Sequence, residues 1–185
     1  MRVDQIFSAT SSDKNKLQSH LEGLLQSWRQ LGIPPRWQLM NQLEDLIAWR
    51  GKNQITGLWK SPPLMLTATL DDGWGHGLEV IELSARVVGV RIQRIGLLQT
   101  PDQIVDCCHR LSPGLLGLTV LQFDSEASLR LICENVHETT QVAAGGPPFQ
   151  IDPEFAMRTK VDFAAKNVAD FLGFIIESDF PHSHI

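Results

Sequence analysis

From residue 64 onward, short apolar runs alternate with segments of helical periodicity. The runs, which have the length of buried strands, are 64–70, 90–95, 115–121, 141–144 and 161–164. The helix-like segments between and after them are 77–88, 101–112, 125–138 and 167–177. This alternation is typical of an α/β protein with a parallel sheet that helices cover on both faces.

Local chemistry supports the helix starts. In Thr100-Pro101-Asp102-Gln103, the threonine can cap a helix, the proline suits its first turn and the glutamine can close a capping box. Asn167 is a second candidate cap. Five strands, with three helices between them and a fourth after the last strand, predict the flavodoxin-like, doubly wound plan of a five-stranded parallel sheet.

The first sixty residues carry a different pattern. Residues 12–31 have the apolar spacing of an amphipathic helix, Gly32-Ile33-Pro34-Pro35 ends it, and a second helical pattern runs from Trp37 toward Gly51, a plausible stop. We therefore expect a helical hairpin extension over 1–60 and an α/β domain over 61–185. Tryptophans 28, 37, 49 and 59 are expected to fill a helix-domain interface, with a lid over a flat ligand as the alternative.

Composition narrows the class of protein. The chain has 185 residues, 43% of them hydrophobic, enough for one well-buried domain with a small extension. Its net charge of −5 and the lack of a basic run argue against nucleic-acid binding. No apolar run approaches the roughly twenty residues that cross a bilayer. Because Met1-Arg2-Val3-Asp4 does not open a signal peptide, we expect a cytoplasmic protein that does not bind membranes.

The cysteines and the C-terminal histidines are weak candidates for chemistry. Cys107, Cys108 and Cys133 lack metal-binding spacing and are interpreted as reduced core or half-buried thiols. His182-x-His184 could capture a metal from one face of an extended strand, but a frayed tail is the simpler interpretation.

Three motifs lie at the ends of strand-like runs. Asp72-Gly73-Trp74-Gly75-His76-Gly77 follows the first run, Thr119-Val120-Leu121 ends the third, and Gly145-Gly146 follows the fourth. The carboxyl ends of parallel strands share one edge of a sheet, where such folds bind ligands. Together the motifs resemble the cobalamin (vitamin B12)-binding domain family, whose pattern is Asp-x-His-x-x-Gly, then Ser-x-Leu, then Gly-Gly. The resemblance extends over residues 64–178.

The resemblance implies a set of cofactor-binding residues: Asp72, Trp74, Gly77, Thr119, Leu121, Gly145 and Gly146. In the family, the histidine of the first motif coordinates cobalt in place of the cofactor's own dimethylbenzimidazole, and the aspartate hydrogen-bonds that imidazole. Trp74 stands at the histidine position, and an indole nitrogen is a donor only. We therefore expect a bound cobalamin, or another tetrapyrrole, not to be histidine-ligated, so that its benzimidazole remains on cobalt or water takes the lower site. His76 is either a shifted ligand or a surface histidine.

No separate active site is evident in the sequence. The adjacent carboxylates Asp71 and Asp72 do not converge easily on one ion, and the chain has no Gly-x-Ser-x-Gly elbow, Walker loop or zinc signature. The leading hypothesis is a divergent corrinoid-binding module without catalysis of its own, which binds a tetrapyrrole or serves regulation with a protein partner. The alternatives are a corrinoid methyl-carrier subunit of a methyltransferase system, and a ligand-free interaction domain in which Trp74 fills the former cofactor slot.

Overall fold

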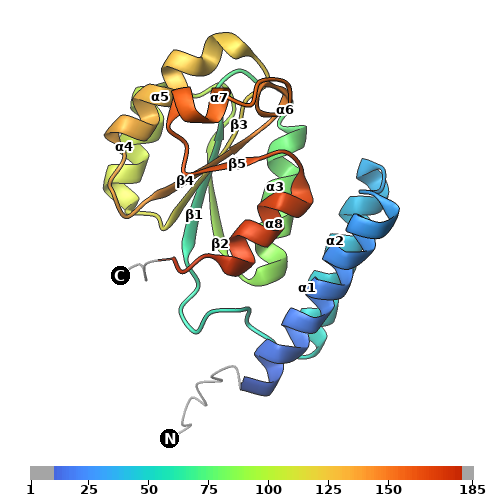
Figure 1. Ribbon diagram of the computed structural model, residues 1–185. Coiled ribbons are helices and arrows are strands. Elements are labelled where there is room, and N and C mark those ends of the chain that lie inside the picture. Colours follow the sequence, from blue (N-terminus) through green and yellow to red (C-terminus); the bar gives the residue numbers. More distant parts are fainter. Residues whose placement is uncertain (1–10, 181–185) are drawn as a thin grey trace, which may run out of the picture.

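A parallel sheet forms the centre of the molecule. The computed structural model describes residues 11–180, in which helices α1 (Ser11–Leu31) and α2 (Arg36–Lys52) precede five strands. The strands are β1 (Leu64–Thr69), β2 (Arg91–Gly96), β3 (Leu115–Thr119), β4 (Gln141–Gly145) and β5 (Phe163–Ala165). All neighbours pair in parallel in the order β2-β1-β3-β4-β5 (Figure 1). The flavodoxin-like fold and the preceding helical hairpin are therefore confirmed.

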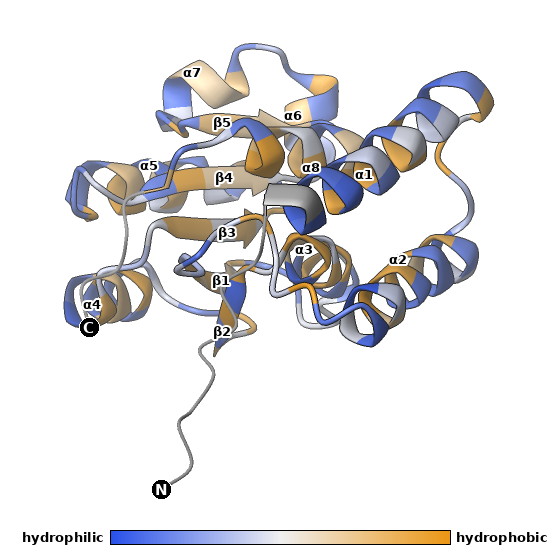
Figure 2. Ribbon diagram, turned by 90° about the horizontal axis from the view of Figure 1, so that it is seen from below, coloured by the Kyte–Doolittle hydropathy of each residue, from blue (hydrophilic) through white to orange (hydrophobic). Residues whose placement is uncertain are grey.

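Helices cover both faces of the sheet. They are α3 (His76–Val88), α4 (Pro101–Leu111), α5 (Glu126–Asn135), α6 (Pro147–Ile151), α7 (Phe155–Thr159) and α8 (Val168–Glu177), with a 3-10 turn at Phe123–Ser125. Figure 2 shows α4 and α5 on one face, α3 and α8 on the other, and the α1–α2 hairpin outside α3 and α8.

Successive side chains of a strand point to opposite faces of the sheet, so the hydrophobic core consists of two clusters, one on each face. Leu64, Leu66 and Ala68 of β1 face the cluster under α4 and α5, while Met65 faces the cluster under α3 and α8. The second cluster also contains the buried residues of α1 and α2, so the hairpin shares its core with one side of the α/β unit.

A buried carboxylate fixes α3 to the strands beneath it. Glu82 accepts hydrogen bonds from Thr67 Oγ1 (2.6 Å) and from Arg94 Nε and Nη2 (2.8 and 2.6 Å). Burial alone would raise the pKa of Glu82, but the hydrogen bonds from Arg94 and Thr67 outweigh it and hold that pKa below its usual value. The charge is thus paired across α3, β1 and β2.

The predicted helix starts are confirmed in atomic detail. Thr100 and Gln103 form the reciprocal capping box of α4 around Pro101, and the Asn167 side chain accepts the Asp170 N–H (3.0 Å) at the start of α8. The predicted end of the second helix at Gly51 is wrong. The helix α2 runs through Gly51 to Lys52 and ends at Asn53, whose side chain donates to the Trp49 carbonyl (2.8 Å).

Three of the four N-terminal tryptophans contribute to the packing of the hairpin. Trp28 is buried, and its Nε1 donates to Gln42 (2.9 Å); Trp49 and Trp59 are half-buried and pack against the same core cluster. The prediction is wrong for Trp37, which is 68% exposed at the start of α2.

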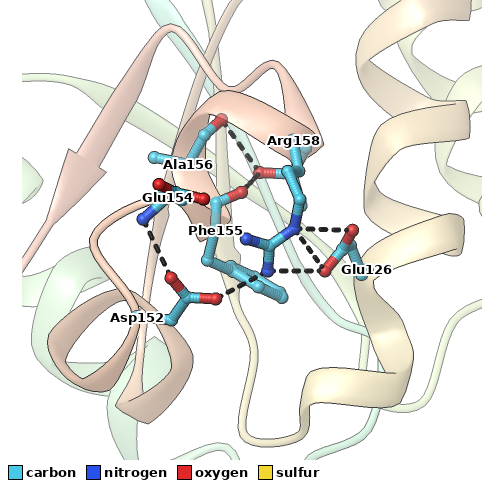
Figure 3. A network of polar contacts seen from close by, with 7 residues as sticks. Glu126, Asp152, Glu154, Phe155, Ala156 and Arg158 are labelled. Carbon is cyan, nitrogen blue, oxygen red and sulfur yellow. Dashed lines mark hydrogen bonds and ion pairs between the residues drawn. The ribbon is translucent and has the colours of Figure 1, made fainter.

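The segment between β4 and β5 contains the two short helices α6 and α7, which the sequence pattern did not predict. A charge network holds them to α5 (Figure 3). Arg158 of α7 donates to both oxygens of Glu126 (2.9–3.1 Å) and to Asp152 Oδ2 (2.6 Å), and its guanidinium lies 5.8 Å from the centre of the Phe155 ring. The hydrogen bonds from Arg158 lower the pKa of Glu126 and of Asp152.

The cysteines are free thiols, with Cys108 buried and Cys107 and Cys133 half-buried, as predicted. Burial raises the pKa of Cys108 and of Cys133 to about 12. His182 and His184 lie outside the described residues. Among residues 11–180, no helix combines the length and hydrophobicity that a membrane-spanning segment requires.

Candidate functional site

The register of the sheet brings the three motifs to one edge. Thr69, the last residue of β1, pairs with Thr119 of β3, and Thr119 pairs with Gly145 of β4. The loops that follow these strands therefore emerge side by side, at the end of the sheet where α3 begins (Figure 1). The prediction that the first, third and fourth strands deliver the motifs to one edge is confirmed.

Asp71 joins two of these loops. Its carboxylate accepts the N–H groups of Leu121 and Gln122 (both 2.9 Å) and the hydroxyl of Ser125 (2.7 Å). The N–H groups that would continue β3 are thus used by a side chain from the β1 loop. This explains why β3 ends at Thr119 and not at Leu121, as the apolar run predicted.

Asp72 holds its own loop. It is only 4% exposed, and its Oδ1 accepts the backbone N–H of Trp74 (2.7 Å). Thr69 Oγ1 donates to the Asp72 carbonyl (2.5 Å) and accepts the N–H of Leu98 (2.9 Å), which ties the loop after β2 to the loop after β1. The two adjacent carboxylates therefore serve different loops and do not converge.

Trp74 and His76 project from this loop into solvent. The Trp74 side chain is 80% exposed. The His76 ring lies nearly parallel to the indole, with a centroid distance of 6.3 Å and an interplanar angle of 20°, and its Nδ1 is 4.0 Å from Glu79 Oε2. Histidine 76 is thus a surface residue at the first position of α3.

A cavity of about 380 Å³ opens beside the loops, a size that falls in the range of small-molecule sites. Its lining is mostly apolar and includes Ile33, Leu39, Val80, Ile81, Leu118, Val168 and Phe171. The polar lining residues are Thr119, Gln150, Lys166 and Asn167.

Five of the seven predicted site residues line this cavity, namely Gly77, Thr119, Leu121, Gly145 and Gly146. Asp72 and Trp74 do not. In the alternative of a ligand-free interaction domain, Trp74 would fill the former cofactor slot, but its side chain points into solvent and does not line the cavity.

Thr119 carries the one polar atom of the cavity lining that is buried without a hydrogen-bond partner, as far as the described part of the chain goes. Its residue is 6% exposed, and its Oγ1 finds no acceptor or donor. A buried hydroxyl is normally paired, and because this one has no protein partner it can bond water or a ligand group in the cavity.

At two glycines that line the cavity, an added side chain would come too close to neighbouring atoms. A Cβ on Gly77 would lie 3.2 Å from Cγ2 of Thr119, tighter than ordinary contact. Gly146 has a φ of +133° and a Cβ there would lie 1.9 Å from the Val120 carbonyl oxygen, which excludes any side chain. Gly146 therefore requires glycine because a backbone carbonyl approaches closely, whereas a side chain at position 77 would displace the Thr119 methyl by a few tenths of an ångström.

The hairpin forms a wall of the cavity that the sequence did not predict. Ile33, from the turn between α1 and α2, and Leu39 of α2 both line it. The Arg36 guanidinium pairs with Glu79 in the first turn of α3 and so holds this turn beside the motif loops. The only sequence signal was the helix-breaking run 32–35, which does not reveal where the turn packs.

The described residues contain no group of three His, Cys, Asp or Glu side chains that could hold a metal ion. What the edge provides is a preformed apolar cavity with one unpaired hydroxyl, next to an exposed aromatic side chain. This arrangement can hold a partly polar organic group in the cavity and a larger flat body above the edge.

No family model matches the sequence, and no curated protein sequence does. Solved structures do resemble it. A cobalamin-binding protein from Desulfitobacterium hafniense DCB-2 superposes with a TM-score of 0.76 at 18% identity, over 91% of this chain and 84% of that one. The monomethylamine corrinoid protein of Methanosarcina barkeri gives 0.55 at 17% identity, over 87% and 79%.

A chain of the methanol:cobalamin methyltransferase complex MtaBC from Methanosarcina barkeri gives a TM-score of 0.61 at 12% identity, over 92% of this chain and 68% of that one. At these identities the likeness concerns the fold. The hairpin and the α/β unit together thus have the architecture found in these cobalamin-binding and corrinoid proteins.

Proposed function

We propose that this protein binds cobalamin or a related corrinoid at the carboxyl edge of its sheet, and that it has no catalytic activity of its own. The observation that carries the proposal is the buried, unpaired hydroxyl of Thr119 in a largely apolar cavity at the point where three motif loops meet. The fold of the structural neighbours, which are cobalamin-binding and corrinoid proteins, supports it.

The residues present fit the nucleotide tail of such a cofactor. The tail combines a flat aromatic base with a ribose and a phosphate, and the cavity combines apolar walls with the hydroxyl of Thr119 and the side chains of Gln150, Lys166 and Asn167. The corrin ring would rest on the exposed loops above, where Trp74 projects. The cofactor would supply the cobalt chemistry, and the protein would supply binding and orientation.

The second candidate function is that of a methyl-carrier subunit working with separate methyltransferases. Two of the structural neighbours favour it, since one is a corrinoid protein for monomethylamine and the other belongs to a methanol:cobalamin methyltransferase complex. For either role the cofactor would take the same site in this protein, and a protein partner would reach the corrinoid from the solvent side of the sheet edge. We infer a protein partner for either role.

A retention experiment tests the proposal. The purified protein is incubated with hydroxocobalamin, methylcobalamin or haem, passed through a desalting column and measured by visible absorbance. We expect both cobalamins to be retained. Loss of both cobalamins on the column would contradict the proposal, and retention of haem alone would assign the site to another tetrapyrrole.

A cavity-filling variant locates the binding. Val80 of α3 lines the cavity, so Val80→Phe should abolish retention while leaving the circular dichroism spectrum unchanged. Leu131→Phe is the matched control, because Leu131 is exposed on α5, on the opposite face of the sheet. If Val80→Phe retains cobalamin like the control, the tail does not enter this cavity.

A further inference from the structure

A cleft of about 720 Å³, called the β5 cleft below, lies between α1, α8 and one edge of the sheet. Strand β5 is the last strand in the sheet order, and its residues Phe163 and Ala164 line the cleft. Figure 2 shows α1 beside α8 on this side of the molecule. The β5 cleft adjoins the cavity at the carboxyl edge, with which it shares Ile33, Lys166 and Asn167. Its volume is in the range of small-molecule sites.

Aromatic side chains form much of the wall of the β5 cleft. The half-buried rings of Phe163 and Phe174 stack, with centroids 4.2 Å apart and an interplanar angle of 10°. Trp28 of α1 also lines the cleft, and its Nε1 already donates to Gln42. The indole and the two phenyl rings therefore offer a ligand mainly aromatic carbon, which favours a flat aromatic group.

Gly173 keeps the middle of the cleft open. It lies within α8, where glycine weakens a helix relative to alanine. A Cβ added at Gly173 would have no atom within 4 Å, so packing inside the described chain does not require glycine here. The missing side chain leaves free space beside Phe174, at the place where a ligand would enter.

Arg29 and Lys166 line the β5 cleft without a partner for their charges. Among residues 11–180, most arginine side chains bind a carboxylate, a backbone carbonyl or a thiol. The side chains of Arg29 and Lys166 are exposed and make no hydrogen bond or ion pair with any described residue. The guanidinium of Arg29 thus presents a planar set of free donors, which matches the geometry of a carboxylate or a phosphate.

The carboxylates of the cleft do not cancel these cations. Asp170 accepts the backbone N–H of Lys166 and the Nδ2 group of Asn167 (both 3.2 Å), so its oxygens are engaged at the start of α8. Glu177 lies at the other end of α8 and is the one lining carboxylate without a partner in the described chain. The unpaired cations therefore outnumber the unpaired carboxylate, and this favours an anionic ligand over a cationic one.

We propose that the β5 cleft binds a small molecule with a flat aromatic body and a carboxylate or phosphate group. The aromatic body packs against Trp28 and Phe174, in the space that Gly173 leaves. The anionic group binds Arg29 and Lys166. This site lies beside the proposed corrinoid site and does not depend on it.

Titrations followed by ligand-observed nuclear magnetic resonance test the class of ligand. Naphthoate and naphthyl phosphate carry an anionic group on the same flat body, and naphthylmethylammonium carries a cationic one. We expect at least one anion to bind about tenfold more tightly than the cation or better, and the tighter anion identifies the group that is recognised. Failure of both anions to bind, or equally tight binding of the cation, would overturn the proposal.

Matched variants locate the bound anion. Gly173→Leu places a side chain in the open space of the cleft and should abolish binding, whereas Gly23→Leu, at an open glycine of α1 that does not line the cleft, should bind like the wild type. Arg29→Gln should weaken binding about tenfold. Arg91→Gln removes an unpaired arginine of β2, at the opposite edge of the sheet, and should leave binding unchanged.

A comparison with cobalamin retention keeps this site apart from the proposed function. Gly173→Leu should still retain cobalamin, and Val80→Phe should still bind the anion, because Val80 lines the neighbouring cavity and not the β5 cleft. Circular dichroism checks that each variant is folded. Equal anion binding by Gly173→Leu and Gly23→Leu, or by Arg29→Gln and Arg91→Gln, would show that the anion binds elsewhere and would overturn the proposal.

Discussion

Replacing Thr119 by valine should affect stability and affinity in opposite directions. The Thr119 hydroxyl is buried without a partner, and an unsatisfied polar group costs about 1–3 kcal/mol. Valine has nearly the same shape and suits a strand. Because water in the cavity can relieve part of the cost, we expect Thr119→Val to stabilise the cofactor-free protein by about 1 kcal/mol. For a chain of this size, that corresponds to roughly 2–4 °C in the unfolding midpoint.

The affinity for cobalamin should fall at the same time. If the hydroxyl bonds the nucleotide tail, its loss removes about 1 kcal/mol of binding free energy, which weakens binding about fivefold. Thr119→Ser keeps the hydroxyl and should keep the affinity. Thermal unfolding with and without hydroxocobalamin measures both quantities in one assay.

A matched control separates a functional hydroxyl from a structural one. Thr140 is also buried, but its hydroxyl donates to the Pro113 carbonyl (2.9 Å). Thr140→Val should therefore destabilise the protein by about 1 kcal/mol and leave cobalamin affinity unchanged. If Thr119→Val destabilises the free protein like Thr140→Val and binds cobalamin as tightly as the wild type, the assignment of the hydroxyl to the cofactor is refuted.

Three further predictions concern the scaffold. Gly146→Ala should destabilise the protein by about 3 kcal/mol or more, because the added Cβ overlaps the Val120 carbonyl. Gly173→Ala, on the open face of α8, should stabilise it by up to about 1 kcal/mol. Denaturant unfolding compares the two variants, and equal effects would contradict the close approach at Gly146. Arg158→Gln should lower the unfolding midpoint at neutral pH, because the two carboxylates that Arg158 binds have lowered pKa values. The stabilisation by this ion pairing is complete above the unfolded-state pKa values of the two carboxyl groups and is lost as the pH falls through their folded-state pKa values. The unfolding midpoints of wild type and variant should therefore converge in acid. A difference in midpoint that persists in thermal scans under acidic conditions would argue against a role of these two carboxylates. Because desolvation raises the pKa of Cys108 and of Cys133 to about 12, both thiols should resist alkylation at pH 8 in the folded protein. Rapid labelling of either, seen by mass spectrometry, would contradict the raised pKa.

The parts of the fold that depend on local patterns were predictable. Five apolar runs of strand length separated by helical periods imply a covered parallel sheet, and the capping box at Thr100 marks a helix start without tertiary information. Strand ends depend on partners elsewhere in the chain. Nothing local shows that the N–H of Leu121 bonds to Asp71, fifty residues earlier, and so ends β3. The short helix at Pro147 is likewise too brief for periodicity, although prolines suit a first helical turn.

The candidate site also has a part that the sequence predicts and a part that depends on tertiary packing. Its glycines and Thr119 follow strand ends, so the topology alone places them at one edge. The wall made by Ile33 and Leu39 depends on how the hairpin packs on α3 and α8, and that is decided by the shared core and by the pairing of Arg36 with Glu79. A helix-breaking run in a sequence indicates a turn but carries no information about its neighbours.

Asp72 holds its loop through the backbone and not through the neighbouring side chain. Oδ1 of this buried carboxylate accepts the backbone N–H of residue 74. That hydrogen bond does not depend on the side chain at position 74, so the loop keeps its shape with tryptophan as it would with histidine. The conformation of the loop and the side chain at position 74 are thus separable, so a substitution at Trp74 should leave the cavity, the hairpin wall and the hydroxyl of Thr119 in place.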